Sequence, residues 1–104
     1  MKKVFLSMVP LVKREFNVID TLNLLKIDIG SFLSLGISQL VNFNNKGIGL
    51  KVDGKKHKGY VFISLDYTDT YTVDIITKTG KIKQTFEMIY FDQLLDTLTK
   101  SIVR

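Results

Sequence analysis

The sequence predicts an α+β fold, an antiparallel sheet (a meander of about four or five strands) with N-terminal and C-terminal helices packed on one face. Apolar residues occupy every second position in residues 61–65, 71–75 and 82–90, with Gln84 as the one exception, and clusters of Asp, Thr and Gly separate these runs. This period is typical of half-buried antiparallel strands. Apolar residues recur at helical spacing in residues 11–26 and again after Phe91. With 104 residues, we expect a single α+β domain covering residues 1–104.

The first half of the chain is less regular. Residues 1–10 fit an extended arm or a first turn, and both alternatives stay open. Pro10 suits the first position of a helix that continues to Lys26. We interpret residues 28–31 as a stop and a turn, and expect residues 32–43 to be irregular and to pass into a strand. Residues 44–47 (NNKG) predict a turn, followed by a strand over residues 48–52.

The C-terminal segment predicts one amphipathic helix. Its apolar face consists of Phe91, Leu94, Leu95, Leu98 and Ile102. Acidic residues at its start and basic residues at its end complement the helix dipole. This helix would cover the same face of the sheet as the N-terminal one.

Composition narrows the classes of function. The formal net charge is +5 and the chain has no cysteine and one histidine, so we expect no metal site and no cofactor. No apolar run approaches the length of about 20 residues that spans a bilayer. The apolar run at the N-terminus is shorter than a usual signal core, so we expect a cytoplasmic protein, in a host cell, without a membrane partner.

The predicted topology gathers lysines at one end of the sheet. Successive turns of a meander lie at alternate ends, so the loop 53–59 and the turn 78–81 share an end, and the acidic turn 66–69 lies at the other. Lysine-rich turns can simply keep a small domain soluble, or they can form a contact surface for phosphates or for an acidic protein groove. The candidate partner-binding residues are Lys51, Lys55, Lys56, His57, Lys58, Lys78, Lys81 and Lys83.

Residues for catalysis are sparse. Asp66, Asp69 and Asp74 could form a carboxylate cluster for metal binding or acid–base chemistry, but we interpret them as turn residues, because Asp and Thr bond their own backbone in tight turns. His57 lies among lysines, where we expect it to be solvated. The chain contains no nucleophile motif and no phosphate-binding glycine loop. We therefore expect a protein that is not an enzyme and has no catalytic residues.

Three segments resemble a family of small uncharacterised proteins carried by bacteriophages, prophages and other mobile elements. The residues in question are Phe32–Phe43, the hairpin Val61–Val73 and the entry to the last helix, Ile89–Leu94; together they lie within roughly residues 16–100. The resemblance implies a mobile-element setting, in which small proteins often bind and block a host machine.

In that setting the first hypothesis is an inhibitor of host defence, and specifically an anti-CRISPR protein that blocks a nucleic-acid-handling effector or nucleoprotein complex. The alternatives are a nucleic-acid-binding accessory protein of phage replication or regulation, and a sponge for a nucleotide signal, which would need a pocket. Lysines flanking the sheet edges favour a monomer.

Overall fold

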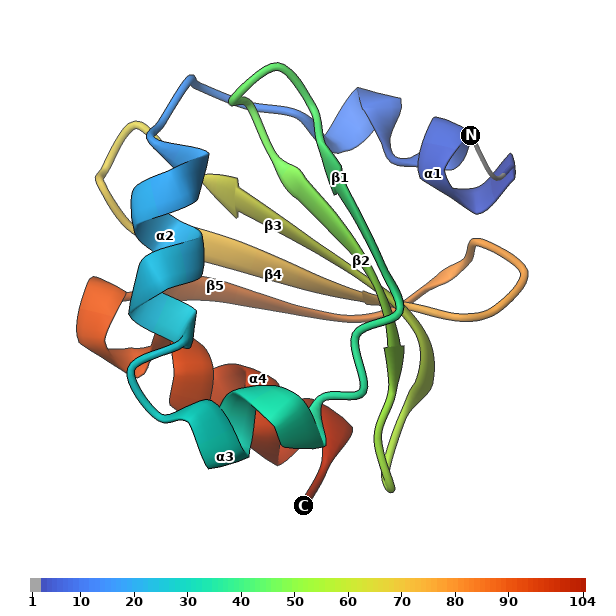
Figure 1. The fold of residues 1–104 in the computed structure, drawn as a ribbon. Helices are drawn as coiled ribbons and strands as arrows, with labels where there is room; N and C mark the ends of the chain where they lie inside the picture. Colours follow the sequence, from blue (N-terminus) through green and yellow to red (C-terminus); the bar gives the residue numbers. More distant parts are fainter. Residues whose placement is uncertain (1–2) are drawn as a thin grey trace.

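The structure is a computed structural model that describes residues 3–104. Five strands form one open antiparallel sheet in which each strand pairs with its neighbours in the chain, so the predicted meander is confirmed (Figure 1). The strands are β1 Gln39–Asn42, β2 Ile48–Asp53, β3 Lys58–Leu65, β4 Tyr71–Ile76 and β5 Ile82–Ile89. The helices are α1 Lys3–Ser7, α2 Val18–Leu25, α3 Ile29–Ser34 and α4 Leu94–Ile102, with 3₁₀ turns η1 Val9–Leu11 and η2 Phe91–Gln93.

Successive side chains of β3 point to opposite faces of the sheet and contribute to two separate hydrophobic cores. Val61 and Ile63 point to one face of the sheet and pack with the predicted helices. Tyr60 and Phe62 point to the opposite face and pack with Phe5 of α1. Because both sets are almost fully buried, the sheet is covered on both faces at β3, whereas the edge strands β1 and β5 are mostly exposed.

The first face carries α2, α3 and α4, whose apolar residues form the main core, including Leu25, Leu94, Leu98 and Ile102. The shared location of α2 and α4 agrees with the sequence prediction. Phe91, which we placed on the same helical face as Leu94, is instead more than half exposed. It lies in η2, before α4 begins, so the helical spacing does not extend to it.

The predicted helix over residues 11–26 begins later than expected. Asn17 is its N-cap and accepts a hydrogen bond from the backbone N–H of Asp20 at 3.0 Å. Before it, the N–H groups of Lys13 and Phe16 donate to the carbonyls of Lys46 and Asn45 in the β1–β2 turn. These bonds replace helical ones, so the segment before Asn17 crosses the end of the sheet instead of forming helix.

Residues 3–11 are helical, which excludes an extended arm for this part of the N-terminal segment. They form α1 and η1, which lie away from α2–α4 (Figure 1). Phe5 meets Tyr60 edge to face, with ring centroids 5.3 Å apart, and Met8 is fully buried. The N-terminal segment is therefore the cover of the second face of the sheet.

Residues 28–34 were wrongly predicted to be a turn followed by irregular structure. Asp28 is an N-cap, and its carboxylate accepts hydrogen bonds from the N–H and the hydroxyl of Ser31 at 3.2 and 2.9 Å. These bonds lower the pKa of Asp28 and start α3. The predicted strand follows as β1.

No helix in the described part of the chain is both long and apolar enough to cross a membrane.

Candidate functional site

Three of the predicted lysines, Lys51, Lys58 and Lys78, line one cleft. They come from β2, from the start of β3 and from the β4–β5 turn. The cleft has a volume of about 700 Å³, and its other lining residues are Gly36, Ile37, Ser38, Val52, Asp53, Gly59 and Tyr60. We call this site the lysine cleft.

The register of β2 and β3 positions most of these side chains. Lys51 is the cross-strand partner of Tyr60, and Asp53 is the partner of Lys58. Cross-strand partners project to the same face of a sheet, so all four side chains share the face on which α1 also lies. Tyr60 is only 5% exposed, which gives the cleft a fixed aromatic boundary.

One carboxylate partly offsets the positive charge. The Lys58 Nζ atom lies 3.8 Å from the Asp53 Oδ1 atom, and both side chains are more than 60% exposed. Exposed pairs of this kind contribute about 0–1 kcal/mol. Lys58 can therefore leave Asp53 for a stronger anion at little cost.

The backbone after α3 forms one wall of the cleft. Gly36 has a φ of +63°, and a Cβ atom there would lie 2.3 Å from the carbonyl oxygen of Asp53. The N–H of Asp53 donates to Leu35 O at 3.1 Å, and the N–H of Ser38 donates to Lys51 O at 3.0 Å. The wall is thus tied to β2. Sequence reasoning missed Gly36, although a glycine after a helix was a usable signal.

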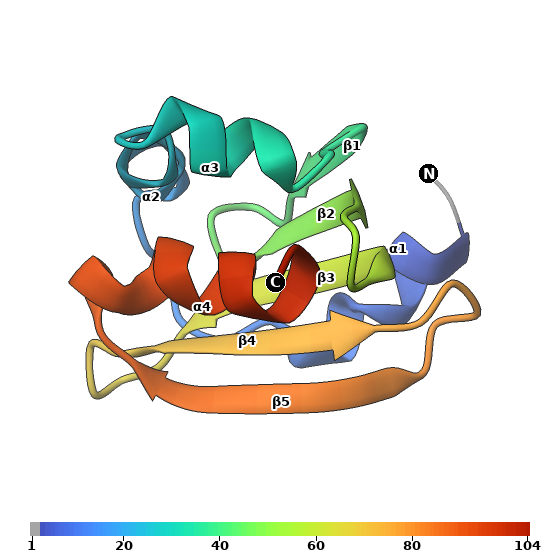
Figure 2. The same cartoon turned by 90° about the horizontal axis from the view of Figure 1, so that it is seen from below.

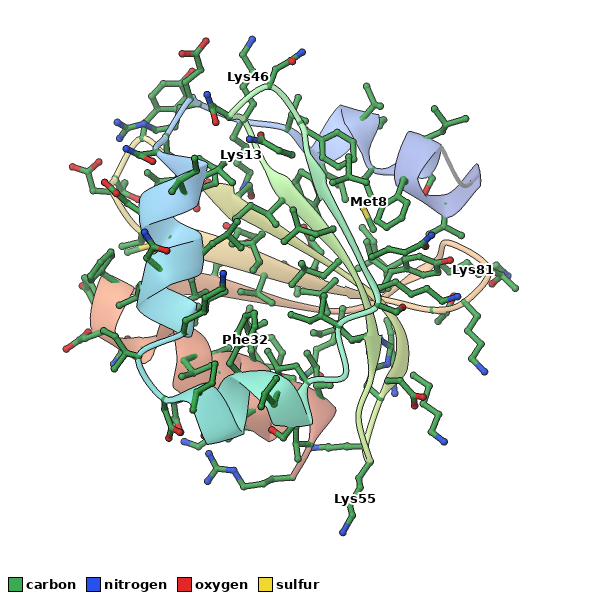
Figure 3. All side chains as sticks on the ribbon, in the orientation of Figure 1. Met8, Lys13, Phe32, Lys46, Lys55 and Lys81 are labelled. Carbon is green, nitrogen blue, oxygen red and sulfur yellow. The ribbon has the colours of Figure 1, made fainter. Side chains whose placement is uncertain are left out.

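The remaining lysines of the predicted group do not reach the cleft. Lys55 and Lys81 point in different directions from different turns (Figure 3). Lys56 donates to the carbonyl of Lys100 at 3.2 Å, and Lys83 is an exposed residue of β5. The two turns do share an end of the sheet, but they diverge, so the predicted basic surface is divided.

His57 is buried, and the prediction that it is solvated is wrong. It is 5% exposed, and its Nε2 atom lies 3.3 Å from Tyr60 O. The N–H groups of Lys56 and His57 both donate to Ile102 O, at 2.8 and 3.1 Å. The end of α4 therefore packs against this loop and turns the imidazole inward, away from any exposed partner surface.

The opposite end of the sheet is less acidic than predicted. Lys13 Nζ lies 2.7 Å from Asp66 Oδ1, and Arg14 pairs with Asp69. Burial opposes ionisation of Asp66, but hydrogen bonds from Lys13 and Thr72 and the charge of Lys13 outweigh it and lower the pKa. The segment before α2 thus brings two cations to the acidic turn and reduces the expected charge asymmetry of the molecule.

The predicted turn role agrees with the structure for Asp66 and Asp69 but is wrong for Asp74, which lies within β4. Backbone hydrogen bonds join Asp66 and Thr70 at 2.8 Å and Asp69 and Asp66 at 3.0 Å. Asp74 is separate from that turn and accepts a hydrogen bond from the Thr85 hydroxyl at 2.7 Å. Within residues 3–104, no three His, Cys, Asp or Glu side chains gather as they would around a metal ion.

Comparison with family models, with curated proteins and with solved structures finds no match to this chain.

Proposed function

We propose that this protein is a non-enzymatic binding protein that docks an anionic partner in the lysine cleft. The supporting observation is that Lys51, Lys58 and Lys78, from three separate elements, line one concave site with a single carboxylate, Asp53. A concave arrangement of one sign of charge raises the local concentration of oppositely charged ligands and speeds their association.

The partner we favour is a host effector protein that handles nucleic acid, such as a CRISPR effector, and the protein would act as its inhibitor. The sequence resemblance to mobile-element proteins supports this setting. The mechanism would be steric: an acidic groove of the effector, or of its nucleoprotein complex, receives the lysines and is thereby covered. Electrostatic docking of this kind weakens as salt screens the charges.

The cleft itself favours a second candidate, a sponge for a small nucleotide signal. Its volume of about 700 Å³ falls within the range of roughly 300–1,000 Å³ that is usual for small-molecule sites. Lysine ammonium groups bind phosphates as point charges, and the Tyr60 side chain offers an aromatic edge.

The test compares two double variants of equal net charge. Lys58→Glu with Lys78→Glu reverses the charge of the cleft, while Lys26→Glu with Lys46→Glu changes exposed lysines outside it. Each tagged protein is used to capture partners from a host lysate, with nuclease-treated and untreated halves, and its melting temperature is measured with and without nucleotides.

Capture of a host effector in both halves, lost only in the cleft variant, supports the inhibitor. Capture that disappears with nuclease supports nucleic acid as the ligand, and a nucleotide-dependent rise in melting temperature supports the sponge. Unchanged capture and unchanged nucleotide response in the folded cleft variant would contradict a binding role for the cleft.

A further inference from the structure

The sheet ends at β5, an open edge of eight residues. In the described part of the chain β5 pairs with β4 alone. Figure 2 shows β5 as the outermost strand of the sheet, beside β4, and shows α4 on one face of that sheet. An edge strand of this kind presents unpaired backbone N–H and C=O groups that can pair with another chain. The other edge, β1, has four residues.

A groove of about 380 Å³ runs between this edge and α4. Gln84, Phe86 and Ile89 of β5 line one side, and Phe86 and Ile89 also pack on the main core. The α4 side carries Asp96, Thr97, Lys100 and Ser101, and Lys56 completes the lining. The groove thus offers an apolar strip beside free backbone groups.

An extended peptide matches both features at once. Its backbone can pair with the β5 edge while every second side chain, about 6.5–7 Å apart, points to the α4 face and enters the groove. Regular pairing of β5 with β4 covers Gln84–Phe86, and register shifts lie on either side of it. The peptide strand that can pair regularly with β5 is therefore short. Contacts between peptide side chains and the groove have to supply part of the binding specificity.

The charge around the groove specifies an acidic peptide. Asp96 is already engaged, with its carboxylate oxygens 2.9 Å from Lys100 Nζ and 3.0 Å from an Arg104 nitrogen. Hydrogen bonds and charge from these two residues lower the pKa of Asp96 against the effect of burial, so it remains an ionised partner. Lys56 lines the groove. On the edge itself, β5 carries Lys83 and one exposed carboxylate, Glu87, and Lys81 lies just before the strand, so cations outnumber unpaired carboxylates.

We infer that the β5 edge and the α4–β5 groove bind an extended acidic segment of another protein as a sixth strand of the sheet. A second copy of this chain is a poorer occupant, because it carries the same net positive charge of +5 and brings its own lysines to the edge. This site is separate from the lysine cleft, and the inference stands whether or not the cleft binds an anion.

The test uses a synthetic peptide of eight residues that alternate Glu and Val, blocked at both ends, and a matched peptide that alternates Lys and Val. NMR spectra of the ¹⁵N-labelled full chain are recorded with each peptide at millimolar concentration. The Glu–Val peptide is expected to shift the amide signals of β5 and α4 and to slow hydrogen exchange of outward-facing β5 amides. No shift there, or equal shifts with the Lys–Val peptide, would overturn the inference.

Proline variants at two adjacent positions test backbone pairing. Neighbouring residues of a strand direct their N–H groups to opposite sides, so one of Gln84→Pro and Thr85→Pro removes an outward N–H and the other a bond to β4. The variant that keeps the wild-type melting temperature is expected to lose the peptide-induced shifts, whereas Lys58→Glu with Lys78→Glu keeps them. Unchanged shifts in the folded proline variant, or a dimer that the same proline abolishes, would overturn the proposal.

Discussion

Replacing Phe5 by alanine measures how much the N-terminal helix contributes to the fold. The Phe5 side chain is 2% exposed and lies edge to face on Tyr60, with the centroids 5.3 Å apart. Burial of about 150–200 Å² at about 25 cal/mol per Å² stabilises by roughly 4–5 kcal/mol, from which the methyl group kept by alanine is subtracted. The aromatic pair adds about 0.5–1.5 kcal/mol.

We therefore expect Phe5→Ala to lower the free energy of unfolding by about 3–5 kcal/mol, measured by urea denaturation. Leu6→Ala is the matched control, because Leu6 lies in the same helix and is 55% exposed. Its expected cost is about 0.5 kcal/mol or less. If the two variants lost similar small amounts, α1 would not be packed on the second face, and the account of two cores would be wrong.

Two further predictions concern a glycine and a carboxylate. Gly36→Ala should lower the free energy of unfolding by roughly 1–3 kcal/mol, because φ is +63° and the new Cβ would meet Asp53 O. Gly30→Ala is the control, because the nearest atom to its new Cβ is 3.6 Å away, and it should be neutral or slightly stabilising. Equal urea midpoints for the two variants would contradict this reasoning. The lowered pKa of Asp66 stabilises the fold above the ordinary carboxyl pKa, and this contribution is lost as the pH falls through the lower folded-state value. When thermal unfolding is measured between about pH 6 and pH 2, the melting temperature of Asp66→Asn should therefore fall less steeply with decreasing pH than that of the wild type. Parallel curves of melting temperature against pH would show that the Lys13 pairing contributes nothing.

Local sequence patterns were sufficient to predict an antiparallel meander of about four or five strands. Alternation in residues 61–65 and 71–75 is a local property of strands, and short turns between successive strands leave the meander as the simple topology. The apolar face of the last helix was also local, because Leu94, Leu98 and Ile102 recur at helical spacing. The division of the turns between two ends of the sheet followed from that topology.

The contacts between side chains, in contrast, depend on how the elements pack in three dimensions. Lys58 and Lys78 are brought to one cleft while Lys55 and Lys81 diverge, because the direction of a turn depends on the twist and bend of its hairpin. Burial of His57 depends on Ile102, and the role of residues 3–11 depends on apolar positions of β3 that face away from α2–α4. Such contacts join residues far apart in the chain, and no local periodicity records them.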